Sequence, residues 1–340
     1  MGRWRAALAM AMAMVIASPA LASPAPMSPP PVSPPAISPA PVAQDRPALD
    51  PDDPPAVIRT VASDDARITI PIQIDGRGPW NFVVDTGSQR TVISRALAER
   101  LALPLRERVT VISMTGRAEV DTVSVPRLVF GKAVVDDIEA PVLEGEHIGA
   151  AGLLGLDGLH AKRLLMNFRT GRMEISSSQR SLRDPNVIVV EARRRKGQLI
   201  LLDSDVNGMK VSIILDTGTS ISVGNMALMN RLLRKKKAPP LKPVSLTSVT
   251  GETLFGQAGL IERVRMGQVM LRAMPVMFAD AQPFAELELQ DKPALLLGID
   301  ALKLFDRVAI DFGRGKVDFL LPDTGLLDQK RFATAQRAAG

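Results

Sequence analysis

A duplicated set of short motifs constrains this chain more than any other feature. In each copy an apolar stretch is followed directly by Asp-Thr-Gly and then by a residue with a hydroxyl group. The matching blocks are 79–88 with 210–219, 113–116 with 248–251, 151–159 with 294–302, and 167–175 with about 310–318. Blocks that recur in the same order indicate an internal duplication. We therefore expect two similar folded units within one chain.

Length and composition agree with two such units. The chain has 340 residues, of which 46% are hydrophobic and 23% charged, so each unit has enough apolar residues for a core. Apolar and alternating runs predict strands at 66–74, 80–84, 198–206 and 211–215. Short helices are expected near 94–103 and 226–236, with Ser94 and Asn225 as N-caps. The pattern therefore predicts a mostly β protein with little helix.

Composition excludes several kinds of chemistry. Cysteine is absent and there are only two histidines, His147 and His160. Disulfides, thiol nucleophiles and a His- or Cys-rich metal site are therefore excluded, and we expect no metal and no cofactor. Aromatic residues make up 4% of the chain and the net charge is only +6, so nucleic acid is not an expected partner.

The N-terminal residues are typical of an export signal and a linker. Residues 6–17 are apolar after two arginines, and Ala20-Leu21-Ala22 is a small-residue cleavage site, so residues 1–22 are interpreted as a signal peptide cleaved after Ala22. An uncleaved anchor is the alternative, but the run is shorter than the roughly 18 residues that span a bilayer. We expect a periplasmic or secreted protein that meets the membrane only transiently.

The remaining organisation follows from composition and from the duplication. Residues 23–60 are rich in proline and predict a disordered linker. The two units are placed at 61–185 and 186–325, with a tail at 326–340. The basic run Arg193 to Lys196 is expected to be an exposed linker between the units.

The duplicated aspartates, Asp85 and Asp216, are the candidate catalytic residues. Each follows an apolar strand, which would deliver a carboxylate to the edge of a buried layer. Two carboxylates held close together cannot both ionise easily, so they share one proton. The ionised group can then act as general base on a water, while the protonated group donates to a substrate carbonyl. This chemistry hydrolyses an amide without a metal, a histidine or a covalent intermediate.

The neighbouring residues suit the same task. Gly87 and Gly218 allow a sharp turn and a close approach of the opposite loop. Thr86 and Thr217 are expected to point their hydroxyls across to that loop and to join the two loops.

These motifs resemble the retropepsin/pepsin superfamily of aspartic proteases, and most closely the bacterial exported retropepsin-like proteins with both halves in one chain. The motifs are Asp85-Thr86-Gly87-Ser88 with Leu153-Leu154-Gly155, and Asp216-Thr217-Gly218-Thr219 with Leu296-Leu297-Gly298. The resemblance implies an all-β, bilobal pepsin/retropepsin-like fold with two homologous β-barrel-like lobes and short helices. It also implies a pseudo-two-fold axis between the two aspartates and a peptide bound between the lobes.

The flaps are the first departure from the pepsin pattern. The flap tyrosine of pepsins is absent, because the chain has no tyrosine. Both halves instead carry Thr-Gly, as Thr115-Gly116 and Thr250-Gly251, which is more similar to two retropepsin flaps than to one pepsin flap. Two unrelated β-turns are the alternative.

The residue after each Gly is the second departure. Ser88 and Thr219 match pepsins rather than retroviral enzymes, which usually carry alanine there. We expect their hydroxyls to donate to the outer carboxylate oxygens, and the extra donor to give a more acidic pH optimum than that of a retroviral enzyme.

Other polar residues are given structural interpretations. Asp157 and Asp300 recur at matching positions and are expected to cap helical stretches at 158–166 and 301–306. His147 and His160 have no second ligand at metal spacing and are expected at the surface.

The sequence thus predicts an exported, monomeric aspartic endopeptidase acting on peptide or protein substrates. Both aspartates are present in one chain, so one chain should form one site. The alternatives are a catalytically silent pepsin-like peptide-binding module of the cell envelope, a glycosidase, and a dimerisation module. A glycosidase also uses two carboxylates but does not require duplicated Asp-Thr-Gly motifs.

Overall fold

A computed structural model describes residues 8–9, 14–15, 56–62, 67–159, 162–178, 186–234 and 240–322. The predicted cleavage after Ala22, most of the predicted linker, His160 and the predicted tail lie outside these residues. Within the described residues, no helix is long and apolar enough to cross a membrane.

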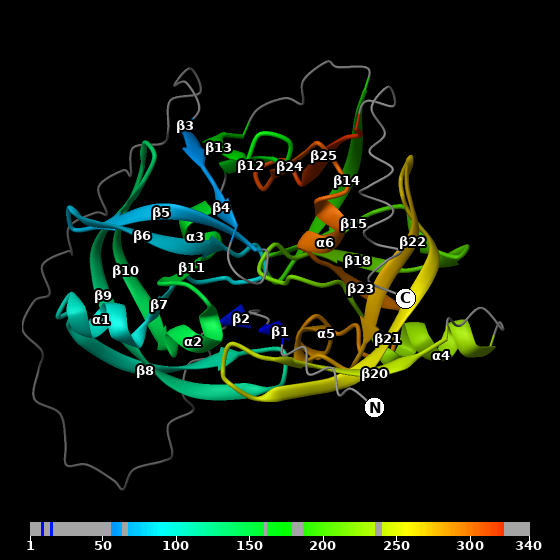
Figure 1. Cartoon of the computed structure of the whole chain (residues 1–340), viewed down its shortest axis with the longest axis horizontal. Coiled ribbons are helices and arrows are strands. Elements are labelled where there is room, and N and C mark those ends of the chain that lie inside the picture. Colours follow the sequence, from blue (N-terminus) through cyan, green and yellow to red (C-terminus); the bar gives the residue numbers. More distant parts are fainter. Residues whose placement is uncertain are drawn as a thin grey trace, which may run out of the picture.

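The first half of the chain forms a nine-stranded sheet (Figure 1). Its strands, in spatial order, are β2 (Met14–Val15), β8 (Leu105–Ile112), β9 (Arg117–Phe130), β10 (Ala133–Leu143), β7 (Val92–Ser94), β11 (Gly152–Leu154), β6 (Arg77–Val84), β5 (Ile68–Ile74) and β4 (Val61–Ala62). Most neighbours are antiparallel, but β11 runs parallel to β6 and antiparallel to β7. The short β11 therefore lies between β6, which ends directly before Asp85, and β7, which follows the loop of Asp85.

The second half repeats this pattern in one part of a sixteen-stranded sheet. The strands of this part, in spatial order, are β1 (Leu8–Ala9), β20 (Lys242–Thr247), β21 (Thr253–Met266), β22 (Val269–Phe278), β19 (Val223–Gly224), β23 (Ala294–Leu297), β18 (Ser212–Leu215) and β15 (Gln198–Leu201), with β16 (Ser204–Val206) and β17 (Met209–Lys210) at the side. Here β23 runs parallel to β18 and antiparallel to β19, as β11 does between β6 and β7. The duplication in sequence is therefore a duplication in topology.

An antiparallel platform joins the two halves at the top of Figure 1. Its strands, in spatial order, are β3 (Ala56–Arg59), β13 (Arg172–Ser177), β12 (Lys162–Asn167), β24 (Arg307–Asp311), β25 (Lys316–Leu320) and β14 (Val187–Arg195). The central pair, β12 with β24, brings one strand from each half together. The buried ion pair of Arg163 with Asp318, at 3.0 Å, crosses the same boundary. The platform therefore fixes the two lobes against each other.

Six short helices complete the fold. They are α1 (Arg95–Arg100), α2 (Gly145–Ile148), α3 (Leu156–Leu159), α4 (Met226–Arg234), α5 (Gln282–Glu286) and α6 (Ile299–Leu302) among the described residues. The predicted N-caps are confirmed, because the Ser94 hydroxyl accepts from the Leu97 N–H and the Asn225 side chain accepts from the Leu228 N–H. The prediction of an all-β bilobal fold with short helices is confirmed.

Two expectations about linkers are corrected. The predicted linker extends too far, because Ala56–Arg59 form the edge strand β3, which pairs with β13. The proline-rich stretch ends at Pro55, and the residues that follow have the backbone N–H that proline lacks and a strand needs. Two of them, Val57 and Ile58, are β-branched and favour a strand. The Arg193 to Lys196 run is mostly exposed but is not a linker, since β14 continues to Arg195 and turns into β15. The unit boundaries at 185 and 186 stay a prediction.

The helical stretches predicted after Asp157 and Asp300 are also shorter than expected. Both helices begin one residue before the aspartate and end within four residues. Lys162–Asn167 is the strand β12, because it pairs with β13 on one side and with β24 on the other. Pairing to two strands outweighs the weak local helix signal at this position.

Candidate active site

Two equivalent loops carry the candidate catalytic carboxylates. β6 delivers Asp85 and β18 delivers Asp216, and both side chains are fully buried. The Asp85 N–H donates to the Leu154 carbonyl at 3.0 Å, and the Asp216 N–H donates to the Leu297 carbonyl at 3.1 Å. Each aspartate is thus fixed by the parallel strand beside it.

Reciprocal hydrogen bonds between threonines join the two loops. The Thr86 N–H donates to Thr217 Oγ1 at 3.1 Å, and the Thr217 N–H donates to Thr86 Oγ1 at 3.1 Å. Each hydroxyl in turn donates to a carbonyl of the opposite strand, Thr86 to Leu215 at 3.3 Å and Thr217 to Val84 at 2.7 Å. The hydroxyls cross between the lobes as the sequence predicts.

The glycines of the two loops lie against the opposite carboxylates. A Cβ added to Gly87 would come within 2.6 Å of Asp216 Oδ1, and one added to Gly218 would come within 2.3 Å of Asp85. Their N–H groups also bind the carboxylate of their own loop, at 2.8 Å from Gly87 to Asp85 and 2.9 Å from Gly218 to Asp216. Close approach therefore requires glycine at both positions.

The electrostatics of the pair follow from this geometry. The pKa of Asp216 is raised well above its ordinary value, mainly by burial, next by the charge of Asp85, and also by a side-chain hydrogen bond with Asp85. Asp85 accepts the N–H groups of both Gly87 and Ser88, at 2.8 and 3.0 Å. Burial and the neighbouring charge together favour the protonated form of Asp216. The geometry suits one proton shared by two carboxyl groups.

The expected role of Ser88 and Thr219 is wrong. The Ser88 hydroxyl donates to the Arg90 carbonyl at 2.6 Å, and the Thr219 hydroxyl donates to the Ile221 carbonyl at 2.8 Å. Both hydroxyls therefore close the turn of their own loop, because each donates its proton to a backbone carbonyl two residues ahead. The expected pH optimum, more acidic than that of a retroviral enzyme, rested on these hydroxyls donating to the carboxylates, so this argument for it no longer holds.

Asp157 and Asp300 support the loops from behind. Asp157 accepts the Thr91 N–H at 2.8 Å and the Thr91 hydroxyl at 2.6 Å, and Asp300 accepts the Ser222 N–H at 3.0 Å and the Ser222 hydroxyl at 2.8 Å. Each also accepts the N–H of the residue that follows it. The prediction that they are N-caps is wrong, because each aspartate is the second residue of its helix. Burial raises the pKa of Asp157, and it raises the pKa of Asp300 to about 6.

The two Thr-Gly turns meet each other. Thr115-Gly116 lies in the turn of the β8–β9 hairpin, called here the first flap hairpin, and Thr250-Gly251 lies in the turn of the β20–β21 hairpin, the second flap hairpin. The Thr250 hydroxyl donates to Ser113 Oγ at 3.0 Å, and the Thr115 hydroxyl donates to Glu252 of the second flap hairpin. The turns are therefore paired elements, and their function in catalysis stays a prediction.

Each tip also contacts the opposite lobe through an apolar side chain. Met114 of the first flap hairpin is buried in a cluster with Ile200 and Ile214 of the second lobe. Val249 of the second flap hairpin is buried in a cluster with Val83 and Leu153 of the first lobe. The flap hairpins therefore connect the lobes on a side other than the platform.

Sequence reasoning missed two buried polar residues near the loops, Arg67 and Gln198. The Gln198 side chain donates to the Gly87 carbonyl across the lobe boundary at 2.6 Å. Arg67 is fully buried, donates to the Ile148 carbonyl, and its charge lowers the pKa of Asp216 against the other effects. The available signal was their similar place before the two motifs, since Arg67 directly precedes β5 and Gln198 begins β15.

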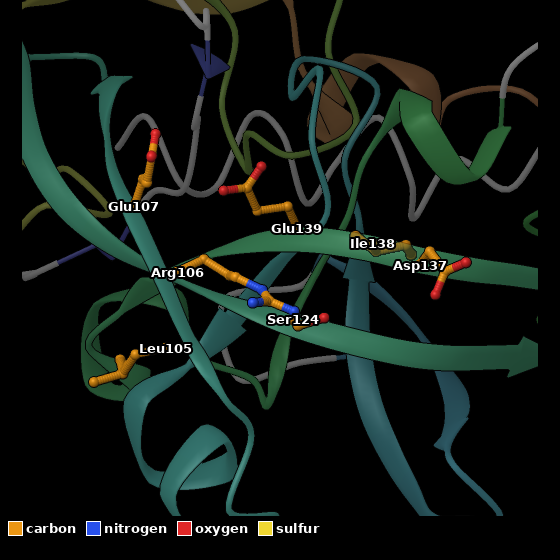
Figure 2. Close-up of a pocket in the computed structure, with 7 residues that line it drawn as sticks. All are labelled: Leu105, Arg106, Glu107, Ser124, Asp137, Ile138 and Glu139. Atoms are coloured by element: carbon orange, nitrogen blue, oxygen red, sulfur yellow. The ribbon is translucent and has the colours of Figure 1, made fainter. Parts of the chain in front are cut away.

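Other candidate sites lie away from the aspartates. A surface pocket on β8, β9 and β10 is lined by residues that include Arg106, Ser124 and Glu139, and none of the candidate residues lines it (Figure 2). The described residues contain no cluster of three or more potential metal ligands. His147 lies against the turn at Gly251, whose added Cβ would be 2.5 Å from the imidazole.

Comparison with known proteins agrees with this geometry. A family model described as aspartyl protease matches residues 70–157 and 202–301, which together exceed half of the chain. The chain belongs to the aspartyl protease family, and the two matched regions confirm the two retropepsin-like halves. Curated proteins gave no match.

The threonine contacts generate a stability prediction. Thr217→Val should destabilise the fold by about 1–3 kcal/mol, because it leaves the buried Thr86 N–H without its acceptor. Thr217→Ser keeps the hydroxyl and should cost less. Thermal and urea unfolding of both variants measure the difference, and equal losses for Val and Ser would contradict the assigned hydrogen bonds.

The loop glycines generate a second prediction. Gly87→Ala places a methyl group within 2.6 Å of the Asp216 carboxylate and should destabilise the chain by about 1–3 kcal/mol. Gly116→Ala is the matched control, since its added Cβ meets no atom within 4 Å. Unfolding midpoints compare the two, and a harmless Gly87→Ala would disprove the close approach.

Asp300 generates a pH prediction. Its pKa is about 6 in the folded chain and near 3.8 when unfolded, so the folded state holds the proton more strongly. The stability contributed by the protonated form is therefore lost as pH rises from about 4 to 6, by roughly 3 kcal/mol at most. Asp300→Asn should flatten this decline in urea unfolding, whereas Asn at the exposed Asp291 should leave it unchanged.

Proposed function

We propose that this chain is an exported aspartic endopeptidase whose catalytic pair is Asp85 and Asp216. The observation that carries the proposal is the pair itself. Two fully buried carboxyl groups come from two copies of one motif, and each lies against the glycine of the other loop. Membership of the aspartyl protease family supports a peptide substrate.

Under this proposal the two carboxyl groups have different roles. Asp85, with two backbone N–H donors, carries the negative charge and removes a proton from the attacking water. Asp216, with its raised pKa, carries the proton and donates it toward the substrate carbonyl. The water oxygen bonds to the carbonyl carbon while its proton passes to Asp85. The C–N bond then breaks as the amine takes up that proton, and the hydroxyl of the intermediate returns a proton to Asp216. The pair titrates as a unit, so each role describes the starting state only.

Export and assembly belong to the same proposal. The N-terminal apolar run and its small-residue cleavage site support export to the periplasm or beyond. Both halves of the site come from one chain, which supports a monomer as the working unit.

Substitution of either aspartate tests the proposal. Asp85→Asn and Asp216→Asn keep the side-chain shape but remove the shared proton, so each should lower peptide cleavage by at least about a thousandfold. Cleavage of a peptide library by the full chain, read by mass spectrometry from pH 3 to 8, measures this. Activity should persist above the ordinary Asp range and fall once both groups ionise, because the pKa of Asp216 is raised.

The control is Asp291→Asn, an exposed carboxyl outside the site. Cleavage that survives in both site variants would overturn the assignment. A wild-type chain that binds library peptides but cuts none would favour the silent peptide-binding module.

A further inference from the structure

The tip of the first flap hairpin is held by the helix α5 of the opposite lobe (Figure 1). The Gln282 N–H donates to the Met114 carbonyl at 3.0 Å. Arg117, the first residue of β9, donates to Glu286 Oε1 from Nη2 at 2.7 Å and from Nε at 3.3 Å. The Gln282 side chain donates to the same oxygen at 3.0 Å. We call the contact of Arg117 with Glu286 the flap anchor.

The carboxylate is the buried end of the flap anchor. The Glu286 side chain is 9% exposed, whereas the Arg117 side chain is 58% exposed. A carboxylate with so little access to water depends on hydrogen bonds and a positive partner, and Arg117 supplies both. The anchor therefore connects a buried group of the second lobe with an exposed group of the flap hairpin.

The same helix is connected to the loop of the first aspartate. Lys196, in the turn between β14 and β15, donates from Nζ to the Glu286 carbonyl at 2.7 Å. The Gln89 side chain, just beyond the first Asp-Thr-Gly motif, donates to the Lys196 carbonyl at 2.7 Å. Gln198 of the same turn region donates to the Gly87 carbonyl at 2.6 Å. A series of hydrogen bonds thus leads from the first flap hairpin, through the second lobe, to the candidate catalytic loop.

The second flap hairpin is held by different chemistry. Because 113–116 align with 248–251, the position equivalent to Arg117 is Glu252, which has the opposite charge. The Glu252 carboxylate accepts from the hydroxyls of Thr115 and Thr250 at the two tips. The turn at Gly251 lies against the imidazole of His147 in α2. The flap anchor is therefore a feature of one copy of the duplicated unit.

We infer that Glu286 is a positioning residue of the site, which holds the first flap hairpin against the second lobe in the position that a bound peptide needs. The inference rests on the proposed function, since it concerns peptide binding at the same site. A hairpin that is correctly placed for only part of the time lowers the apparent affinity for a peptide by that fraction. Because the Glu286 carboxylate acts on the flap hairpin and not on the reacting groups, its loss should weaken binding and leave the chemical step unchanged.

Steady-state cleavage of a peptide selected from the library, by the full chain, tests this separation. Glu286→Gln removes the charge of the buried partner, and Arg117→Gln removes the charge of the exposed partner without disturbing the interior of the second lobe. Each should raise KM about three- to tenfold and leave kcat within about twofold. Asp291→Asn is the matched control, because it removes an exposed carboxylate shortly after α5, and it should change neither constant. An unchanged KM in both test variants, or a loss confined to kcat, would overturn the inference.

The double variant Arg117→Gln with Glu286→Gln tests whether the two residues act through each other. Its KM should rise no further than that of the worse single variant, because the second change has no remaining contact to remove. A rise equal to the product of the two single effects would overturn the assigned pairing.

Hydrogen exchange measures the anchor without any need for activity. The full chain carries Asp216→Asn so that it does not cleave itself, and exchange is read by mass spectrometry in fragments from the two flap hairpins. Glu286→Gln should speed exchange at the tip of the first flap hairpin at least about fivefold, and more than at the second. Equal exchange with and without Glu286→Gln would overturn the inference. The expected exchange in a chain that cleaves no peptide would support the anchor and overturn the proposed protease activity.

Discussion

The reciprocal hydrogen bonds between Thr86 and Thr217 are the contact on which the rest of the site depends. They join the two lobes at a point where the loops pack so closely that no side chain fits at the glycines. Each of these glycines lies against the carboxylate of the opposite loop. A shift of one loop would separate the carboxyl groups and leave buried N–H donors unpaired, at a cost of about 1–3 kcal/mol for each. The spacing of the aspartates and the pKa of Asp216 are therefore consequences of this contact.

Two other connections hold the lobes in the position that this contact needs. The platform pairs β12 with β24 and contains the buried Arg163–Asp318 ion pair. Each flap hairpin also buries an apolar side chain in the opposite lobe. Met114 of the first flap hairpin packs in the second lobe, and Val249 of the second flap hairpin packs in the first. Because the lobes are joined at the platform, the loops and the flap tips, the geometry of the carboxyl groups follows from the whole fold.

Much of the fold and of the candidate site could be predicted, because each motif occurs twice and the two copies support the same interpretation. The aspartates, the threonine contacts and the helix caps at Ser94 and Asn225 all follow from short-range patterns that the structure reproduces. The hydroxyls of Ser88 and Thr219 could not be placed, since two acceptors competed and only backbone geometry decides between them. The extra strand β3 and the short helix α3 depend on pairing with distant strands.

The sequence by itself determined that two like units form, that each presents one aspartate beside a glycine, and that no thiol or disulfide takes part. These properties are local or compositional, so they can be read from residue order. The tertiary structure decided that burial and the charge of Asp85 raise the pKa of Asp216, and that Gln198 donates to the Gly87 carbonyl across the lobe boundary. Burial, charge proximity and strand pairing arise between residues far apart in sequence, and only the folded chain brings them together.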